Sequence, residues 1–150
     1  MSGDRSGYRR PVTSSDLPRC EFAFPGPLRD QLVAAVLSGA KTSTTGLLQD
    51  YELDGEPPPE VGARSVVVDS VDRPVAVIEV TGVRVVRLGD VDLDHARDEG
   101  EGYASVAAWR AGHEAYWHGP DYRAWLGDPE FTVDDDTRAV LERFRVVERL

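Results

Sequence analysis

Lys41 is the residue whose type most directly suggests chemistry, because it is the only lysine in the sequence. Every other side chain that carries a permanent positive charge is an arginine. A primary amine can lose its proton or fit a narrow pocket, whereas a guanidinium stays charged and needs wider space. The single lysine therefore indicates either a specific chemical function or a chance survivor of a codon preference for arginine.

Two carboxylates and three aromatic rings are candidates for substrate contacts. Glu79 and Glu142 each lie among apolar residues in a strand-like run, and a carboxylate there could accept a hydrogen bond from the amino group of cytosine. Tyr103, Trp109 and Trp117 could stack on a base. The alternative interpretations are a solvated strand face for the two glutamates and a core position for Trp109.

The remaining reactive residue types argue against several other sites. His95, His113 and His118 lack H-E-x-x-H spacing, so we expect neither a metal nor a cofactor. Cys20 is the only cysteine, which excludes an internal disulfide and the His/Cys/Cys ligands of zinc deaminases. The segment 99–102, Glu-Gly-Glu-Gly, is not a phosphate loop, since it lacks a Lys-Ser/Thr ending and its acids would repel phosphate.

Length and composition predict one soluble domain. A chain of 150 residues with 41% hydrophobic and 29% charged residues has room for one packed core. We expect residues 1–20 to form a mobile N-terminal tail and residues 21–150 to form the domain. No apolar run approaches the roughly 20 residues of a membrane span, and no secretory signal precedes the domain, so we predict a cytoplasmic protein without membrane contacts. The net charge of −10 disfavours general nucleic-acid coating.

The elements that must position Lys41 can be predicted from periodicity. Leu28, Leu32 and Val36 recur at helical spacing, which predicts a helix over 28–38 that ends at Gly39 and places Lys41 directly after it. Residues 65–69 and 74–88 are predicted to form a hairpin, with a bulge at Gly82. The segment 50–62 is expected to be an exposed loop.

The second half of the chain is predicted to contain two helices and a final strand. Asp92 can cap a short helix that ends at Gly100, and Ser105 can cap a longer helix that stops at Gly119-Pro120. Residues 121–136 are expected to form an acidic loop. Residues 138–147 have strand character.

The segment 38–44, Ser-Gly-Ala-Lys-Thr-Ser-Thr, resembles the G-x-K-T-x-T segment of ASCH-domain proteins. Further matches follow in family order at 74–81, at 95–102, at Trp109 and His113, and at 141–144, so the resemblance covers about residues 22–147. It implies an α+β fold: a PUA-like, partly closed mixed β-barrel flanked by helices, with a cleft at the barrel mouth. Gly46 departs from the pattern, since many members have arginine there, and so does Tyr103.

This resemblance also implies a function. Some bacterial members hydrolyse N4-acetylcytidine and related N4-acylcytosines, so we expect a metal-free amidohydrolase whose substrate is a small nucleoside. The alternative is an RNA-binding ASCH module, with or without ribonuclease activity. Lys41, Thr44 and Glu99 match the family's catalytic positions. The candidate substrate contacts are Thr42, Ser43, Glu79, Glu101, Tyr103, Trp109 and Glu142.

Two assignments of the proton acceptor compete at this point, and we favour the first. Neutral Lys41 could activate Thr44 if burial lowered its pKa by about three units from roughly 10.4, with Glu99 as the proton shuttle. If Lys41 instead forms an ion pair with Glu99, it stays charged and stabilises the oxyanion, and Glu99 is the base. A purely structural alternative has Lys41 and Thr44 capping the preceding helix. The catalytic hypotheses require that Lys41, Thr44 and Glu99 converge.

Overall fold

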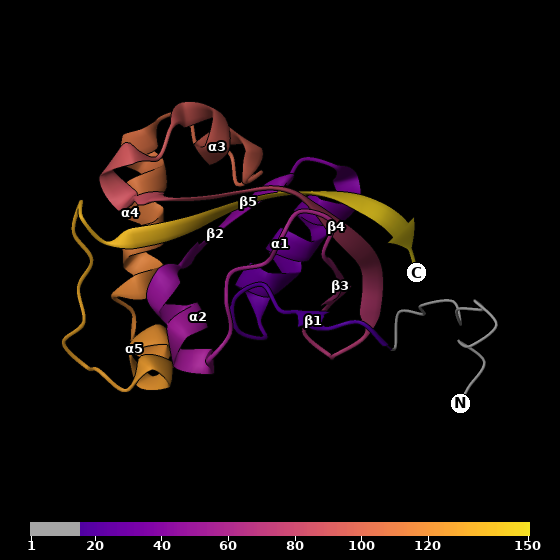
Figure 1. Ribbon diagram of the computed structural model, residues 1–150, viewed down its shortest axis with the longest axis horizontal. Coiled ribbons are helices and arrows are strands. Elements are labelled where there is room, and N and C mark those ends of the chain that lie inside the picture. Colours follow the sequence, from indigo (N-terminus) through magenta and orange to yellow (C-terminus); the bar gives the residue numbers. More distant parts are fainter. Residues whose placement is uncertain (1–15) are drawn as a thin grey trace, which may run out of the picture.

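The computed structural model describes residues 16–150, and these contain one mixed sheet of five strands (Figure 1). The strands are β1 (Arg19–Cys20), β2 (Ser43–Leu47), β3 (Arg64–Val68), β4 (Pro74–Arg87) and β5 (Arg138–Arg149). Their order is β1-β3-β4-β5-β2, with β1 parallel to β3 and every other pair antiparallel. The predicted α+β fold class is confirmed.

The two long central strands bend the sheet. The pairing of β4 with β5 shifts register between Val77 and Ile78 and again between Val80 and Gly82. Each shift inserts an extra residue on one strand and increases the local twist. The bulge predicted at Gly82 is therefore confirmed, and the curvature leaves β2 as an edge strand next to the helices.

Five α-helices pack around this sheet in the described part of the chain: α1 (Pro27–Ser38), α2 (Leu48–Asp54), α3 (Leu93–Asp98), α4 (Val106–Trp117) and α5 (Pro120–Leu126). Helix α1 packs against residues of β3, β4 and β5, where Val36, Ile78 and Phe144 share one core cluster. Figure 1 shows α3, α4 and α5 gathered at one end of the sheet, where Trp109 and Leu141 belong to a second cluster. None of the described helices is long and apolar enough to cross a membrane.

Three boundaries differ from the sequence expectations. The expected loop 50–62 begins inside α2, which buries none of its side chains and so lacks an apolar repeat. Helix α4 ends before Gly119-Pro120 as predicted, but the expected loop 121–136 begins inside α5, because Pro120 also occupies the first turn of that helix, a position that proline favours. The expected tail includes Arg19–Cys20, which pair with β3 through backbone groups. Residues 1–15 of the expected tail lie outside the described residues.

Candidate active site

Lys41 is buried directly after α1. Gly39 ends the helix in the left-handed conformation, with φ of 87°, and the amide of Lys41 donates to the carbonyl of Ala35 at 3.0 Å. Its Nζ donates to the carbonyls of Ser43 at 2.9 Å and Glu99 at 3.3 Å, and to Glu99 Oε1 at 3.3 Å. Three acceptors, one of them a carboxylate, match the three N–H groups of an ammonium. This geometry fits a charged lysine.

Glu99 reaches Lys41 because of the turn after α3. Gly100 has a φ of 77°, and a Cβ at this position would lie 2.8 Å from the carbonyl oxygen of Ala40, so only glycine allows this close approach. Helix α3 is anchored at both ends: Asp92 caps it by accepting from the amide of His95, and the carboxylate of Asp98 pairs with Arg143 at 2.7 Å. The structure thus brings together two residues that lie 58 positions apart.

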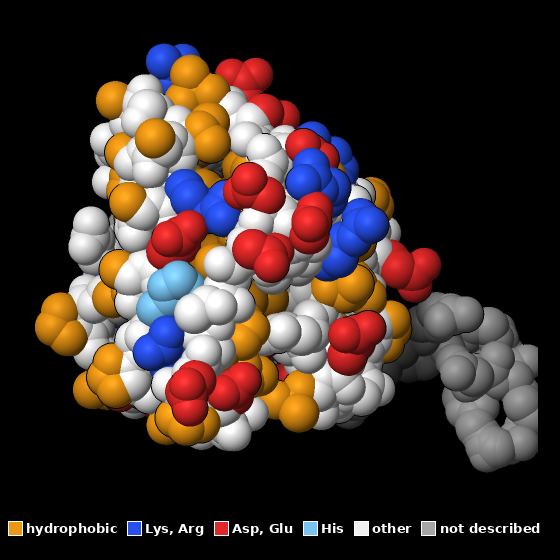
Figure 2. Space-filling view, turned by 90° about the vertical axis from the view of Figure 1, so that its left-hand side faces the viewer, with side chains coloured by type: hydrophobic (Ala, Val, Ile, Leu, Met, Phe, Trp, Pro, Cys, Tyr) orange, Lys and Arg blue, Asp and Glu red, His pale blue; other side chains and the backbone are white. Residues whose placement is uncertain are grey.

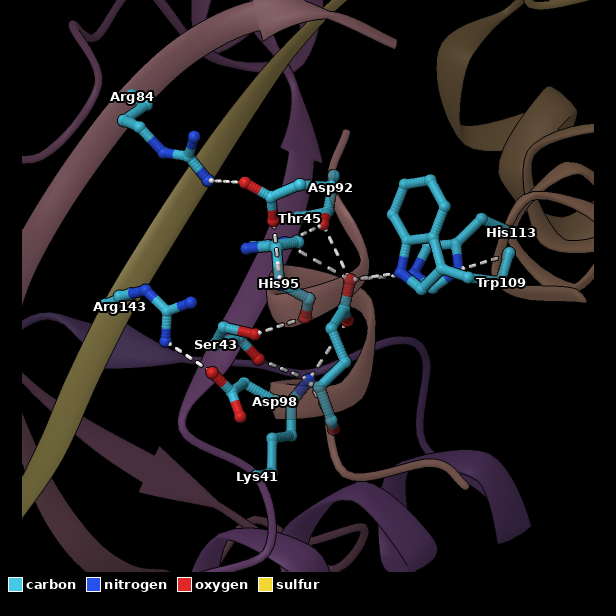
Figure 3. A network of polar contacts seen from close by, with 11 residues as sticks. Lys41, Ser43, Thr45, Arg84, Asp92, His95, Asp98, Trp109, His113 and Arg143 are labelled. Carbon is cyan, nitrogen blue, oxygen red and sulfur yellow. Dashed lines mark hydrogen bonds and ion pairs between the residues drawn. The ribbon is translucent and has the colours of Figure 1, made fainter. Parts of the chain in front are cut away.

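The second carboxylate oxygen of Glu99 accepts three further contacts (Figure 3). Thr45 Oγ1 donates to it at 2.6 Å, Trp109 Nε1 at 2.8 Å, and His113 Nε2 lies 3.2 Å away. Burial alone would raise the pKa of Glu99, but hydrogen bonds from the imidazoles and the charge of Lys41 outweigh it and hold this pKa well below its usual value. Glu99 is therefore a fixed anion and a poor proton shuttle.

His113 carries a proton on both ring nitrogens. Nδ1 lies 3.0 Å from the carbonyl oxygen of Trp109, and Nε2 faces Glu99. A carbonyl and a carboxylate can only accept, so each nitrogen must donate. Burial lowers the pKa of His113, but the hydrogen bond and charge of Glu99, and the charge of Glu101, outweigh it and raise the pKa. An imidazolium thus lies at the wall of the site, stacked on Trp109 with 4.3 Å between ring centroids.

Thr45 belongs to a chain of hydrogen bonds that includes His95. The Nε2 of His95 lies 2.7 Å from Thr45 Oγ1, while its buried Nδ1 has no hydrogen-bond partner within residues 16–150. A buried N–H without an acceptor is costly, so the ring proton is assigned to Nε2. His95 then donates to Thr45, and Thr45 donates to Glu99. The Thr45 hydroxyl is consequently committed to orienting Glu99.

Thr44 points to the opposite side of β2 from Thr45, because successive side chains of a strand alternate. In the register of β2 and β5 it lies directly opposite Glu142, so the two side chains are neighbours on one face. Glu142 Oε2 accepts from the hydroxyl of Tyr51 at 2.6 Å. Burial raises the pKa of Glu142, and the hydrogen bond from Tyr51 partly offsets this. A carboxylate with a raised pKa therefore lies across from Thr44 on the neighbouring strand.

Gly46 provides the space that Tyr51 occupies. A Cβ at Gly46 would lie 3.6 Å from the ring of Tyr51, so a long side chain at this position would displace that ring. At the position where arginine was expected from the resemblance, this chain thus has a glycine, and Tyr51 of α2 passes beside it to reach Glu142.

The predicted catalytic residues converge on one small hollow. Lys41, Thr44 and Glu99 all line a cavity of about 170 Å³, and His113, which was not predicted to be catalytic, lines it as well. Typical sites for drug-sized ligands have roughly 300–1,000 Å³, so this hollow suits one part of a small molecule, such as the region around a single amide.

Two of the seven predicted substrate contacts line this hollow, and the other five do not. Glu101 and Tyr103 line it. Ser43 is buried, and its hydroxyl donates to the carbonyl of His95 at 3.0 Å. The backbone of Thr42 joins α3 to β5, since its amide donates to Asp98 and its carbonyl accepts from Phe144.

Three further predicted contacts, like Ser43 and Thr42, are not in the wall of the hollow. Trp109 is fully buried in the core and reaches the site through its bond to Glu99 and its stacking on His113. Glu142 lies behind Thr44. Glu79 is on β4, where it pairs with Arg64 at 2.9 Å and Arg145 at 3.2 Å.

Glu99, Glu101 and His113 offer ligand atoms within 4.8 Å of one another. The Nζ of Lys41 lies 3.3 Å from Glu99, and both nitrogens of His113 already donate to acceptors. This donor set fits a hydrogen-bond network better than a metal site.

A family model described as the ASCH domain matches residues 20–148. Among solved structures, the chain is similar to the ASCH domain from Lactobacillus crispatus JV V101, with 28% identity and a TM-score of 0.76 over 89% of this chain and 80% of that chain. It is also similar in fold to a protein from Enterococcus faecalis V583, with 21% identity and a TM-score of 0.77 over 97% of this chain and 83% of that chain. No curated protein matches the chain.

Proposed function

This chain belongs to the ASCH domain family, and we propose that it is a metal-free amidohydrolase that removes acyl groups from N4-acylated cytosine nucleosides. Amide hydrolysis needs a nucleophile, a base, an acid for the leaving amine and stabilisation of developing charge. The observation that carries the proposal is that Thr44, His113 and the buried pair of Lys41 with Glu99 line the same small hollow.

In the first half-reaction, Thr44 Oγ1 bonds to the carbonyl carbon of the amide while Glu142 takes the hydroxyl proton. The bond from that carbon to N4 then breaks, and N4 receives the Nε2 proton of His113, which gives up its hydrogen bond to Glu99 in this step. The products are free cytidine and an acyl ester on Thr44. Glu142 suits the role of base because burial raises its pKa toward neutral pH, which makes it a stronger base than an ordinary carboxylate.

In the second half-reaction, water adds to the ester carbon. Neutral His113 takes one proton from the water, and protonated Glu142 returns its proton to Thr44 Oγ1 as the ester bond breaks. The carboxylic acid leaves, and both side chains regain their starting protonation states.

Lys41 and Glu99 supply fixed charge around these steps. Their ion pair, with 1% and 2% of the side chains exposed, supports the assignment in which Lys41 stays charged. Glu99 orients His113 and favours its protonated form. Lys41 places a positive charge next to the carbonyl oxygen that becomes negative. These roles replace the assignment of Glu99 as proton shuttle.

The charge of the site favours a small neutral substrate over RNA. No arginine lines the described wall of the hollow. Arginines of the sheet are paired with acids, as in Arg143 with Asp98 and Arg84 with Asp92. Figure 2 shows acidic and basic side chains interspersed on the face that it presents. An RNA-binding module is the second candidate function. The arginines of the sheet are the basic groups that such a module would use, although they are paired with acids here.

The proposal is tested by incubating purified protein with N4-acetylcytidine and following cytidine by liquid chromatography. We expect catalytic release of cytidine and acetate. Absence of cytidine together with RNA association that weakens steeply with salt would replace the hydrolase by the binding module.

Replacing Tyr51 with phenylalanine should raise the pH below which activity falls. The hydrogen bond from Tyr51 lowers the pKa of Glu142, so its loss raises that pKa further, and Glu142 must be ionised to act as base. The acid limb of the kcat/KM profile should therefore move upward, with little change on the alkaline side. An unchanged acid limb would remove Glu142 from the mechanism.

A further inference from the structure

A second, mostly apolar groove adjoins the reactive hollow. It has a volume of about 320 Å³, and Ala23, Leu28 and Tyr116 line both cavities. Its remaining wall includes Phe24 and Ala115. Three residues are common to both walls, so the two cavities are neighbours, and a molecule that extends from the hollow past Leu28, whose side chain is 39% exposed, would reach the groove.

Hydrogen bonds hold the backbone of the segment that lines both cavities. Ala23 has a φ of 56°, a left-handed conformation that is unfavourable for a residue with a Cβ. Arg29, only 2% exposed, donates to the carbonyl of Phe22 at 3.0 Å and to that of Ala23 at 2.8 Å. The amide of Gly26 donates to Ser70 Oγ at 2.9 Å. These bonds fix the wall before any ligand arrives.

The two cavities differ in chemistry. The hollow contains Glu101 and Tyr103, whose polar atoms suit a nucleoside. The groove contains Phe24 and Pro27, and the shared residue Leu28 is 39% exposed, which is high for a leucine beside a cavity. An apolar group in the groove would cover that side chain.

We propose that the groove is an acyl subsite, which binds an apolar acyl group longer than acetyl while the amide lies beside Thr44. This inference rests on the proposed function, because it assigns the two halves of an N4-acylcytidine to the two cavities. A hexanoyl chain would follow the shared wall past Leu28 and Tyr116, and burial of its extra methylene groups would strengthen binding.

The test compares kcat/KM for N4-hexanoylcytidine and N4-acetylcytidine. We expect the hexanoyl substrate to be favoured at least tenfold. In Ala115→Phe the new ring fills the groove without touching the hollow, so the preference should vanish while acetyl hydrolysis persists. Ala111→Phe, one turn earlier on α4 and outside the groove wall, is the matched control and should keep the preference.

Equal or weaker activity on the hexanoyl substrate, or a preference that survives Ala115→Phe, would overturn the subsite and leave the proposed function standing. If neither substrate is hydrolysed, the proposed function fails. Calorimetry then compares the binding of N4-hexanoylcytidine with that of cytidine and so tests whether the groove binds an apolar acyl group. At least tenfold tighter binding of the acylated nucleoside, lost in Ala115→Phe, would support an apolar site, whereas equal binding would overturn it.

Discussion

Replacing Glu99 with glutamine is expected to lower the free energy of unfolding by about 3–5 kcal/mol, the usual cost of removing one partner from a buried ion pair. The ammonium of Lys41 would remain buried beside a neutral amide. Trp109, Thr45 and His113 would also lose a charged acceptor. For a chain of this length the loss corresponds to a fall in melting temperature of about 6–20 °C.

Thermal and urea unfolding of both proteins would measure this effect. Glu130→Gln is the matched control, because Glu130 is exposed and its substitution should change the melting temperature little. A Glu99→Gln protein as stable as the control would show that the network of Glu99 does not hold the site together.

Replacing His113 with glutamine should reduce kcat/KM for N4-acetylcytidine by about 10²–10⁴-fold, the range typical of a lost general acid. Glutamine can still donate to Glu99, but it cannot transfer a proton to the leaving amine. The loss should therefore appear with the fold retained. His118→Gln, at the C-terminal end of the same helix, should retain most of the activity.

The pH profile separates this role from a structural one. Since the pKa of His113 is raised, wild-type activity should persist above about pH 6.5 and fall as the pH rises through that raised pKa and the ring loses its proton. His113→Gln should lack this alkaline limb. A variant that keeps the limb, even with reduced activity, would show that another group is the acid.

Much of the frame around Lys41 could be predicted from local signals. The apolar repeat before Gly39 predicted α1, and turn residues predicted the hairpin of β3 and β4. Resemblance to ASCH proteins pointed to Glu99, which the structure brings to Lys41. Local patterns could not show the contact itself, because it depends on how α3 docks against β2.

The residues missed by the sequence analysis were missed for physical reasons. Tyr51 lies on α2, a helix without a buried face and hence without an apolar repeat. Thr45 differs from Thr44 only by strand alternation, which requires knowing where β2 begins. His113 had a usable signal: it lies four residues after Trp109 in a predicted helix, and residues four apart share a helix face. That face turns out to point toward Glu99.

From the sequence we favoured Lys41 as the base that activates Thr44 over Lys41 as a fixed positive charge. The three acceptors around Nζ support the charged role, and they also explain why arginine would not serve. Its planar, wider guanidinium would not fit three acceptors that converge on one nitrogen in a closed space.

The measurement that bears most directly on this account is the rate of cytidine release from N4-acetylcytidine by the wild-type protein and by Thr44→Ala, with Thr132→Ala as an exposed threonine control. We predict multiple turnovers by the wild type and the control, and a loss of at least about 10³-fold in Thr44→Ala at unchanged melting temperature, because the acyl-accepting oxygen is gone. Thr44→Ala protein that releases cytidine as fast as the wild type would contradict acyl transfer to Thr44.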